Sequence, residues 1–347
     1  MYDISLITGD GIGPELSESA LAVIGTIPDM AGGGGPSLNV TKLEAGDAAL
    51  ARTGTALPAE TLSAIRGSDA CLKAPVGESA ADVIVALRRM LDLYANVRPA
   101  RSYPGTPALR DDIDMVIVRE NTEDLYTGKE FELGDGSAVA LRIISEAASA
   151  RIARYAFETA RHRGSKMRVT CVHKSNVMRV TDGIFAGACS EVAAQYPDVS
   201  FDQMYVDACA MNLIRQPQEF DVIVTTNLFG DILSDESSQV VGGLGMAPAA
   251  NMGDEFALFE PVHGAGFDIA GKNVANPSSF LLSVCMMLDW LGARNGDESC
   301  TRASDVIESA VLGLARSGVA TADVGGSCTT SEFTAHVVRR MAGGDAA

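Results

Sequence analysis

The sequence predicts an α/β protein of two domains, and three observations support this. The chain has 347 residues, which is more than one hydrophobic core usually fills. Its 47% hydrophobic and 21% charged residues are typical of globular rather than disordered chains. Short strand-like segments alternate with amphipathic helical segments, which is typical of a largely parallel sheet covered by helices. We therefore expect two lobes with a cleft between them.

The elements follow one another in a regular order. Strands are expected at residues 2–8, 69–75, 114–120, 167–173, 201–207 and 221–227. The segment 87–99 is expected to end a helix and to begin a further strand. Helices are expected at residues 14–24, 81–94, 148–163, 184–195 and 229–241. Glycine and proline clusters predict loops at residues 32–36, 104–107, 242–248 and 264–277.

One segment, residues 124–145, breaks the alternation. It has two β-like halves around Gly134, Asp135 and Gly136, and we expect a hairpin or arm there. Such an arm would be either an internal flap or a piece exchanged with a second subunit.

Charge and composition exclude several classes of protein. The balance of 27 Lys and Arg against 45 Asp and Glu gives a formal charge of -18, which would repel nucleic acid and anionic membranes. No apolar run reaches the ~20 residues of a membrane span, and the first residues lack the pattern of a signal peptide. Seven cysteines without a C-x-x-C pair fit free thiols, so we expect a cytoplasmic protein without disulfides or zinc.

A glycine-rich turn, Gly9 to Glu15 (GDGIGPE), follows the first strand and opens a helix. Its spacing differs from the dinucleotide motif G-x-G-x-x-G, and no P-loop lysine follows, so neither assignment holds. The turn either approaches an anion at the helix N-terminus or is only a tight strand-to-helix connection.

Three arginines lie near expected element ends: Arg88, Arg98 and Arg119. A guanidinium binds carboxylates in a bidentate way, so three in one cleft would recognise a di- or tricarboxylic acid. Alternatively, they are unrelated surface or salt-bridge residues.

Asp231 and Asp235 are four residues apart and therefore share one face of a helix. Two such carboxylates repel each other unless a cation lies between them, and Mg²⁺ or Mn²⁺ would suit oxygen ligands. Asp207, at the end of an expected strand, is a third candidate ligand. The alternative is a solvated acidic face.

Lys174 follows an apolar strand, where partial burial would lower the pKa of its amine and make it a usable base. Tyr126 could exchange protons with it. Either residue could equally be an ordinary packing residue.

Taken in order, these segments resemble the metal-dependent β-decarboxylating dehydrogenases, the family of isopropylmalate, isocitrate, homoisocitrate and tartrate dehydrogenases. The resemblance covers nearly the whole chain and rests on seven motifs: GDGIGPE at 9–15, LRRMLDLYANVRP at 87–99, VRENTEDLY at 118–126, VHKSNV at 172–177, YVDACAMNL at 205–213, DVIVTTNLFGDILSDE at 221–236 and FEPVHGAGFDIAGKNVANP at 259–277.

The resemblance implies a two-domain fold that is not a Rossmann fold, with a β arm at a dimer interface. It places the cofactor-binding domain at residues 1–99 plus 246–347 and the second domain at 100–245. It further implies a homodimer, or a higher oligomer, with shared active sites. Each site would lie in the cleft between the domains and take Asp207 and Lys174 from the neighbouring subunit.

The resemblance also implies roles for single residues. Arg88, Arg98 and Arg119 would bind the substrate carboxylates, and Tyr126 and Lys174 would be the acid/base pair. Asp207, Asp231 and Asp235 would hold Mg²⁺ or Mn²⁺. The residues expected to contact the cofactor are Asn176, His263, Gly264, Asp268 and Asn276. An acidic residue at 268 accepts hydrogen bonds from ribose hydroxyls and repels a 2′-phosphate, so the expected cofactor is NAD rather than NADP.

The substrate expected from this resemblance is 3-isopropylmalate, a small carboxylic acid with an alkyl group. In the family, specificity lies on the helix before the first arginine, where Ile84 and Val85 offer only apolar surface. These two residues could instead be core residues of an amphipathic helix. Homoisocitrate or isocitrate is the alternative substrate, because RENTEDLY at 119–126 is shared with those members. A non-catalytic regulatory subunit would lack the metal aspartates, the lysine or the tyrosine, and none is missing.

Overall fold

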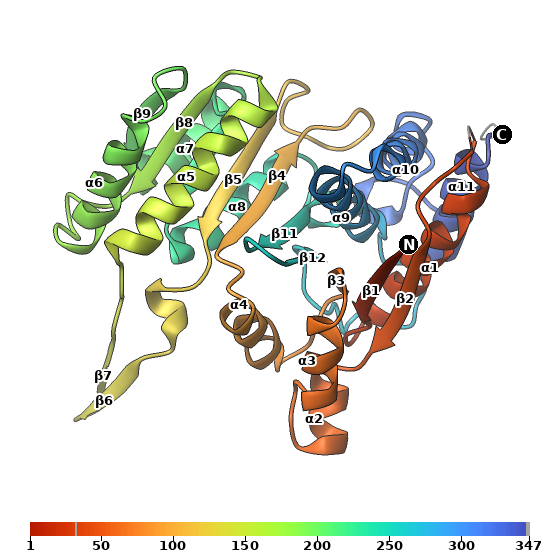
Figure 1. Ribbon diagram of the computed structural model, residues 1–347, viewed down its shortest axis with the longest axis horizontal. Coiled ribbons are helices and arrows are strands. Elements are labelled where there is room, and N and C mark those ends of the chain that lie inside the picture. The colour runs from red at the N-terminus through yellow and green to blue at the C-terminus, as the bar shows by residue number, and fades with distance from the viewer. Residues whose placement is uncertain (32, 345–347) are drawn as a thin grey trace.

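The computed structural model describes residues 1–31 and 33–344, which form helices around one long twisted sheet (Figure 1). The order of its ten strands is β2-β1-β3-β12-β11-β4-β5-β10-β8-β9. Their bounds are β1 Tyr2–Ile7, β2 Leu38–Leu43, β3 Ala70–Lys73, β4 Ala95–Arg101, β5 Asp114–Glu120, β8 Arg168–His173, β9 Ser200–Tyr205, β10 Val222–Thr225, β11 Pro248–Met252 and β12 Ala257–Pro261.

The helices lie on both sides of this sheet. They are α1 Gly13–Thr26, α2 Asp47–Thr53, α3 Ala59–Arg66, α4 Ala86–Met90, α5 Glu146–Arg163, α6 Thr181–Ala193, α7 Val206–Arg215, α8 Asn227–Val240, α9 Ser278–Asn295, α10 Glu298–Arg316 and α11 Thr330–Met341. A π-helical turn, Ala81–Val85, leads into α4, and 3₁₀ turns occur at Ile27–Asp29, Asp124–Thr127, Pro217–Glu219, Leu244–Met246 and Ala322–Val324.

Alternating residues of the strands pack in separate hydrophobic cores on the two faces of the sheet. On β5, Val116 and Val118 pack in the core that contains α5 and α6, whereas Ile117 packs with residues of α7 and α8. This separation follows from the two-residue period of a strand. Fully apolar strands are therefore buried on both faces, as parallel strands between helices require.

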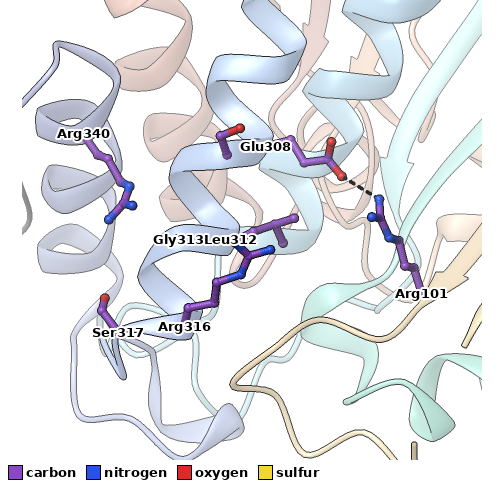
Figure 2. A pocket seen from close by; sticks show the side chains of 8 residues that line it. Arg101, Glu308, Leu312, Gly313, Arg316, Ser317 and Arg340 are labelled. Atoms are coloured by element: carbon purple, nitrogen blue, oxygen red, sulfur yellow. Dashed lines mark ion pairs between the residues drawn. The ribbon is translucent and has the colours of Figure 1, made fainter. Parts of the chain in front are cut away.

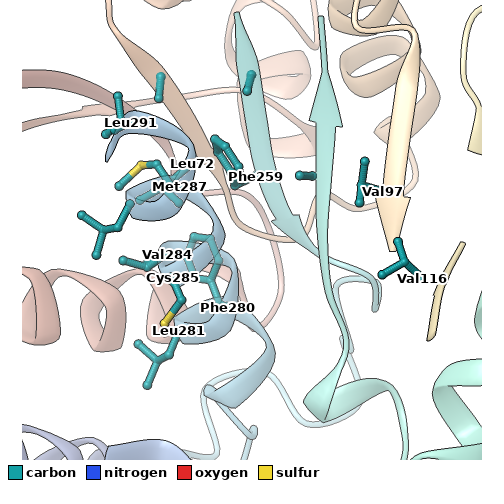
Figure 3. Close-up of a cluster of buried hydrophobic side chains, with 14 of the residues drawn as sticks. Leu72, Val97, Val116, Phe259, Phe280, Leu281, Val284, Cys285, Met287 and Leu291 are labelled. Carbon is teal, nitrogen blue, oxygen red and sulfur yellow. The ribbon is translucent and has the colours of Figure 1, made fainter. Parts of the chain in front are cut away.

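Helix α9 is the most deeply buried helix near the middle of the sheet. Figure 3 shows Phe280, Val284 and Met287 of this helix beside Leu72 of β3 and Phe259 of β12. Their packing holds β3 and β12 together, and these two strands carry residues of the site described below.

The largely parallel sheet is confirmed, with one difference. Strands β12, β11, β4 and β5 pair with antiparallel neighbours in the middle of the sheet. The sequence patterns missed β2, β11 and β12. Strands β11 and β12 follow the glycine-rich residues 242–248, where we expected a loop, and they form a hairpin whose central position depends on tertiary packing. The proposed division into residues 1–99 plus 246–347 and 100–245 stays a prediction.

The segment 124–145 forms the expected hairpin, with strands β6 Glu130–Gly134 and β7 Ser137–Ala140. Gly134, Asp135 and Gly136 all have positive φ, which explains why the turn uses these residues. The hairpin projects from the rest of the molecule (Figure 1), and all its strand residues are exposed. Among the described residues, no helix is long and apolar enough to span a membrane.

Candidate active site

A cavity of about 310 Å³ lies where β4, β5, β12 and α4 approach one another. Its wall includes the three predicted arginines, Arg88, Arg98 and Arg119, together with Tyr126 and Asp231. The structure therefore brings together residues that are up to 143 positions apart in the sequence. All three are buried around one cavity, so the alternative of unrelated surface arginines is wrong, although each of them does form an ion pair.

Arg98 and Arg119 converge on the acidic face of α8. Arg98 donates to Asp231 at 3.3 Å and to Asp235 at 3.1 Å, and Arg119 donates to the same oxygen of Asp231. Asn227 and Ser234, also on α8, accept from Arg119 and Arg98 at 2.7 Å each. These contacts fix both guanidinium planes toward the cavity.

The electrostatic balance keeps Arg119 and Asp231 charged. Burial, and then the neighbouring charges of Arg98 and Arg88, lower the pKa of Arg119 to about 9, so its guanidinium is protonated at neutral pH. Burial opposes ionisation of Asp231, but Arg119 and Arg98 outweigh it and hold the pKa of this carboxyl below its usual value. The cavity thus presents an excess of positive charge toward an anionic ligand.

Asp231 and Asp235 lie one helical turn apart, as predicted. Burial raises the pKa of Asp235, although Arg98 acts in the opposite direction. Asp235 is half exposed, and in the described part of the chain only one of its oxygens accepts a hydrogen bond. This pair of hard oxygen donors fits a divalent cation, provided that further ligands complete the shell.

The third predicted metal ligand, Asp207, does not join this pair within one chain. Among the described residues, no three acidic, histidine or cysteine side chains are grouped to hold a metal. Asp207 instead pairs with Lys174, and neither residue lines the cavity. Asp207 also lies in the first turn of α7 rather than at the end of a strand, because β9 stops at Tyr205.

Tyr126 lies in the 3₁₀ turn that follows β5. Its hydroxyl donates to Oδ2 of Asp231, and its ring lies 4.9 Å from the guanidinium carbon of Arg119. Burial is the main reason that the pKa of Tyr126 is raised. The phenol is therefore protonated at neutral pH and points into the cavity region that the arginines surround.

A second charged cluster in the cavity was not predicted from the sequence. Lys73 of β3 and Glu260 of β12 form a buried ion pair of 2.7 Å, and Arg88 lies 3.5 Å from the other oxygen of Glu260. Asn251 of β11 donates to Glu260 at 2.7 Å and accepts from Arg88 at 2.9 Å. The available signal was a lysine within the apolar segment ACLKAP and a glutamate within LFEP.

Ile84 and Val85 line the same cavity and are half-buried, on the turn that leads into α4. The neighbouring Val83 and Leu87 are fully buried in the core beneath them. Ile84 also packs against this core, so it contributes both to the core and to the cavity wall, whereas Val85 is not part of that core. These two side chains make part of the cavity wall apolar, one helical turn before Arg88.

A second cavity of about 280 Å³ adjoins the first, because His263 and Gly264 line both. Asn276 also lines it and donates to Asp323 at 3.0 Å. An added Cβ at Gly245 would lie 2.4 Å from the same aspartate, so this wall has no room for a side chain. A concave surface with apolar and amide groups suits a nucleotide.

Two predicted cofactor residues lie outside this cavity. Asp268 is exposed and borders Ile269, which lines the cavity, but Asp268 itself does not. Asn176 is exposed in the turn after β8. Of the glycine-rich turn, only Ile12 lines the cavity, and its backbone N–H donates to the carbonyl of Ala265 at 2.8 Å. Gly9 and Gly11 have positive φ, and a Cβ at either position would collide with a backbone oxygen.

The protein thus combines a ten-stranded α/β fold with two adjoining cavities, one of them lined by three buried arginines. Residues 3–337 match the family model described as isocitrate/isopropylmalate dehydrogenase, and the chain belongs to that family. This confirms the resemblance and the predicted isocitrate/isopropylmalate dehydrogenase-like fold, whereas the role of the hairpin as an arm at a dimer interface stays a prediction.

Individual relatives and a solved structure of the same family are similar to this chain over nearly its whole length. The chain is 50% identical to 3-isopropylmalate dehydrogenase of Sulfurisphaera tokodaii over 98% of this chain and 99% of the relative. It is 41% identical to homoisocitrate dehydrogenase of Methanocaldococcus jannaschii over 96% of this chain and 95% of the relative. The crystal structure of isocitrate dehydrogenase from Methylococcus capsulatus superposes with a TM-score of 0.91 at 40% identity, covering 99% of this chain and 100% of that one.

Proposed function

We propose that this protein oxidises and decarboxylates 3-isopropylmalate to 2-oxo-4-methylpentanoate, a step of leucine biosynthesis, with NAD as oxidant and a divalent metal. The observation that carries the proposal is the composition of one cavity. Three buried arginines line it together with the apolar side chains of Ile84 and Val85. Such a cavity suits an acid with two carboxylates and an alkyl group, because a third carboxylate on the apolar wall would lose its hydration without a partner.

The arginines would bind and orient the substrate. Arg98 and Arg119 are held by α8, and Arg88 is held by Asn251 and Glu260. Their guanidinium groups are already fixed, so little side-chain entropy is lost when a carboxylate binds. Positioning of this kind is a large part of the rate enhancement available to an enzyme.

Asp231 and Asp235, with Asp207 from a second copy of the chain, would hold Mg²⁺ or Mn²⁺. His263, Gly264 and Asn276 would contact NAD, with Asp268 and Asn176 at the edges of its site. When bound, the metal ion lowers the pKa of the substrate hydroxyl and stabilises negative charge, and NAD accepts the hydride.

Two protein groups would move protons. Lys174 would accept the proton of the substrate hydroxyl, directly or through water. Tyr126 would donate a proton to the carbon from which CO₂ departs, and its protonated, half-buried phenol suits this role. Asp231 accepts the hydrogen bond of Tyr126 and thereby holds the phenol toward the cavity.

The position of Lys174 supports a homodimer with shared active sites. Lys174 and Asp207 lie together outside the cavity of their own chain. Large exposed apolar side chains are concentrated on the nearby α6–α8 region and on the hairpin, namely Phe131, Leu133, Val139, Leu141, Val177, Val180, Ile184, Met211, Ile214 and Ile232. Such exposure is typical of a surface that another chain covers. The hairpin would serve as the arm of this interface, and the dimer would work in the cytoplasm.

The proposal is tested by NADH formation with purified protein, Mg²⁺ and a panel of 3-isopropylmalate, homoisocitrate, isocitrate, tartrate and malate. We expect the highest kcat/KM for 3-isopropylmalate and no turnover after chelation of the metal. We also expect Ile84→Ser to lower kcat/KM for 3-isopropylmalate by roughly 10- to 100-fold, as loss of an apolar contact does. A higher kcat/KM for homoisocitrate or isocitrate would replace this substrate assignment with the tricarboxylic alternative.

A further inference from the structure

A second arginine-lined cavity, of about 470 Å³, lies outside the proposed active site. Its wall is formed by the end of β4 and by α10 and α11, and it shares no residue with the substrate cavity. Figure 2 shows Arg101 entering from β4, Arg316 from the end of α10 and Arg340 from α11. We propose that this cavity binds a small dianion, of the size of inorganic phosphate or a short dicarboxylate.

The first argument is an excess of positive charge. Arg101 is 3.5 Å from Glu308, the one acidic residue of the cavity wall. Within the described ranges, neither Arg316 nor Arg340 has a carboxylate at ion-pair distance. Counting the described residues alone, two guanidinium groups of the cavity have no carboxylate partner, on a chain whose net charge is -18. Since neighbouring like charges repel, an anion between them is stabilising.

The second argument is the shape of the surface beneath Arg340. A Cβ at Gly313 would lie 2.5 to 2.7 Å from the guanidinium atoms of Arg340. The guanidinium of Arg340 therefore packs directly against the backbone of α10. Any side chain at position 313 would occupy the same space as this guanidinium. Ser309 lines the same cavity and adds a hydroxyl donor, whereas the hydroxyl of Ser317 donates to the carbonyl of Leu314.

A simpler explanation accounts for part of this arrangement. Arg316 and Arg340 lie in the last turns of their helices, where the helix dipole favours cations. That effect explains why each helix ends in a basic residue. It does not explain why the two side chains and Arg101 share one concave site, where guanidinium groups bind oxyanions in a bidentate way.

The test is calorimetric titration with inorganic phosphate and, separately, with succinate, at low ionic strength. The titrations use the Arg88→Gln background, because Arg88 belongs to the substrate cavity and its loss weakens anion binding there. We expect saturable binding of one anion per chain, and the tighter of the two probes identifies the class of ligand. Binding should weaken as NaCl is added.

Three variants in this background locate the site. Arg316→Gln with Arg340→Gln should weaken binding at least tenfold. Arg294→Gln with Arg302→Gln, two exposed arginines of α9 and α10 outside the cavity, makes the same change in net charge and should leave binding within twofold. Gly313→Ala should displace Arg340 and weaken binding severalfold without lowering the thermal midpoint, because alanine is the better helix former.

Three outcomes would overturn the proposal: no saturable binding of either anion, equal weakening by the two double variants, or unchanged binding in Arg316→Gln with Arg340→Gln. The second would indicate a non-specific charge effect, and the third would place the anion elsewhere. Thermal melts of every variant show whether the protein is folded during the titration.

Discussion

Lys73 and Glu260 form a buried ion pair of 2.7 Å in the wall of the proposed substrate cavity, although 187 positions separate them in the sequence. The parallel pairing of β3 with β12 sets Leu72 beside Phe259. The next residues of the two strands, Lys73 and Glu260, therefore also lie side by side. Burial opposes ionisation of Glu260, but the charges of Lys73 and Arg88 outweigh it and lower its pKa to about 2. Glu260 therefore links the sheet to an arginine of the proposed substrate site.

Replacing Glu260 with Gln should reduce the free energy of unfolding by about 3 kcal/mol or more at pH 7, because Lys73 and Arg88 lose their buried counter-charge. The carboxyl has a lower pKa in the folded than in the unfolded chain, so its stabilising effect is full above about pH 4.5 and is lost as the pH falls toward 2.

Urea denaturation at pH 7, 5 and 3 would measure this effect. The difference between wild type and Glu260→Gln should narrow at pH 3. Glu298→Gln, at a side chain that is 93% exposed, serves as the control and should change stability little at any pH. An equal loss of stability at all three pH values would contradict the electrostatic explanation.

Arg88→Lys should lower kcat/KM for the substrate by about 100-fold, since lysine cannot keep both the contact to Asn251 and a bidentate contact to a carboxylate. The neighbouring Arg89 is exposed on the same short helix and provides a matched control. Steady-state kinetics of Arg88→Lys and Arg89→Lys would compare them. Similar losses in both variants would remove Arg88 from the substrate site.

Mixed dimers would test whether the active sites are shared. Lys174→Met and Tyr126→Phe should each abolish most of the turnover. If Lys174 enters the site of the other subunit, a dimer of one chain of each kind has one site with both residues intact. Coexpressed chains carrying different tags, purified through both tags, should then recover about half of the wild-type turnover per dimer. Mixed dimers as inactive as the parents would place both residues of each site on one chain.

Asp268→Lys should shift cofactor preference toward NADP, because lysine attracts the 2′-phosphate that aspartate repels. We expect the ratio of kcat/KM for NAD to that for NADP to fall at least tenfold. Asp3→Lys, an exposed acidic residue near the N-terminus, makes the same change in net charge and should leave the ratio unchanged. An unaltered ratio in Asp268→Lys would exclude residue 268 from cofactor selection.

The amino-acid sequence alone determined the α/β class, the hairpin and the residue types of the site, because strand and helix periodicities and short motifs are local properties. The spacing of Asp231 and Asp235 already placed them on one helical face. Strands β11 and β12 were missed because a short strand in the middle of a sheet is stabilised by its neighbours rather than by its own pattern.

The tertiary structure alone decided which residues meet. The antiparallel pairing of β4 with β5 brings Arg98 and Arg119 to the same helix, and the pairing of β3 with β12 joins Lys73 to Glu260. The tertiary structure also places Asp207 and Lys174 outside the cavity of their own chain. These contacts depend on strand order and register, which arise from burying many apolar residues at once, and no single segment of the sequence contains that information.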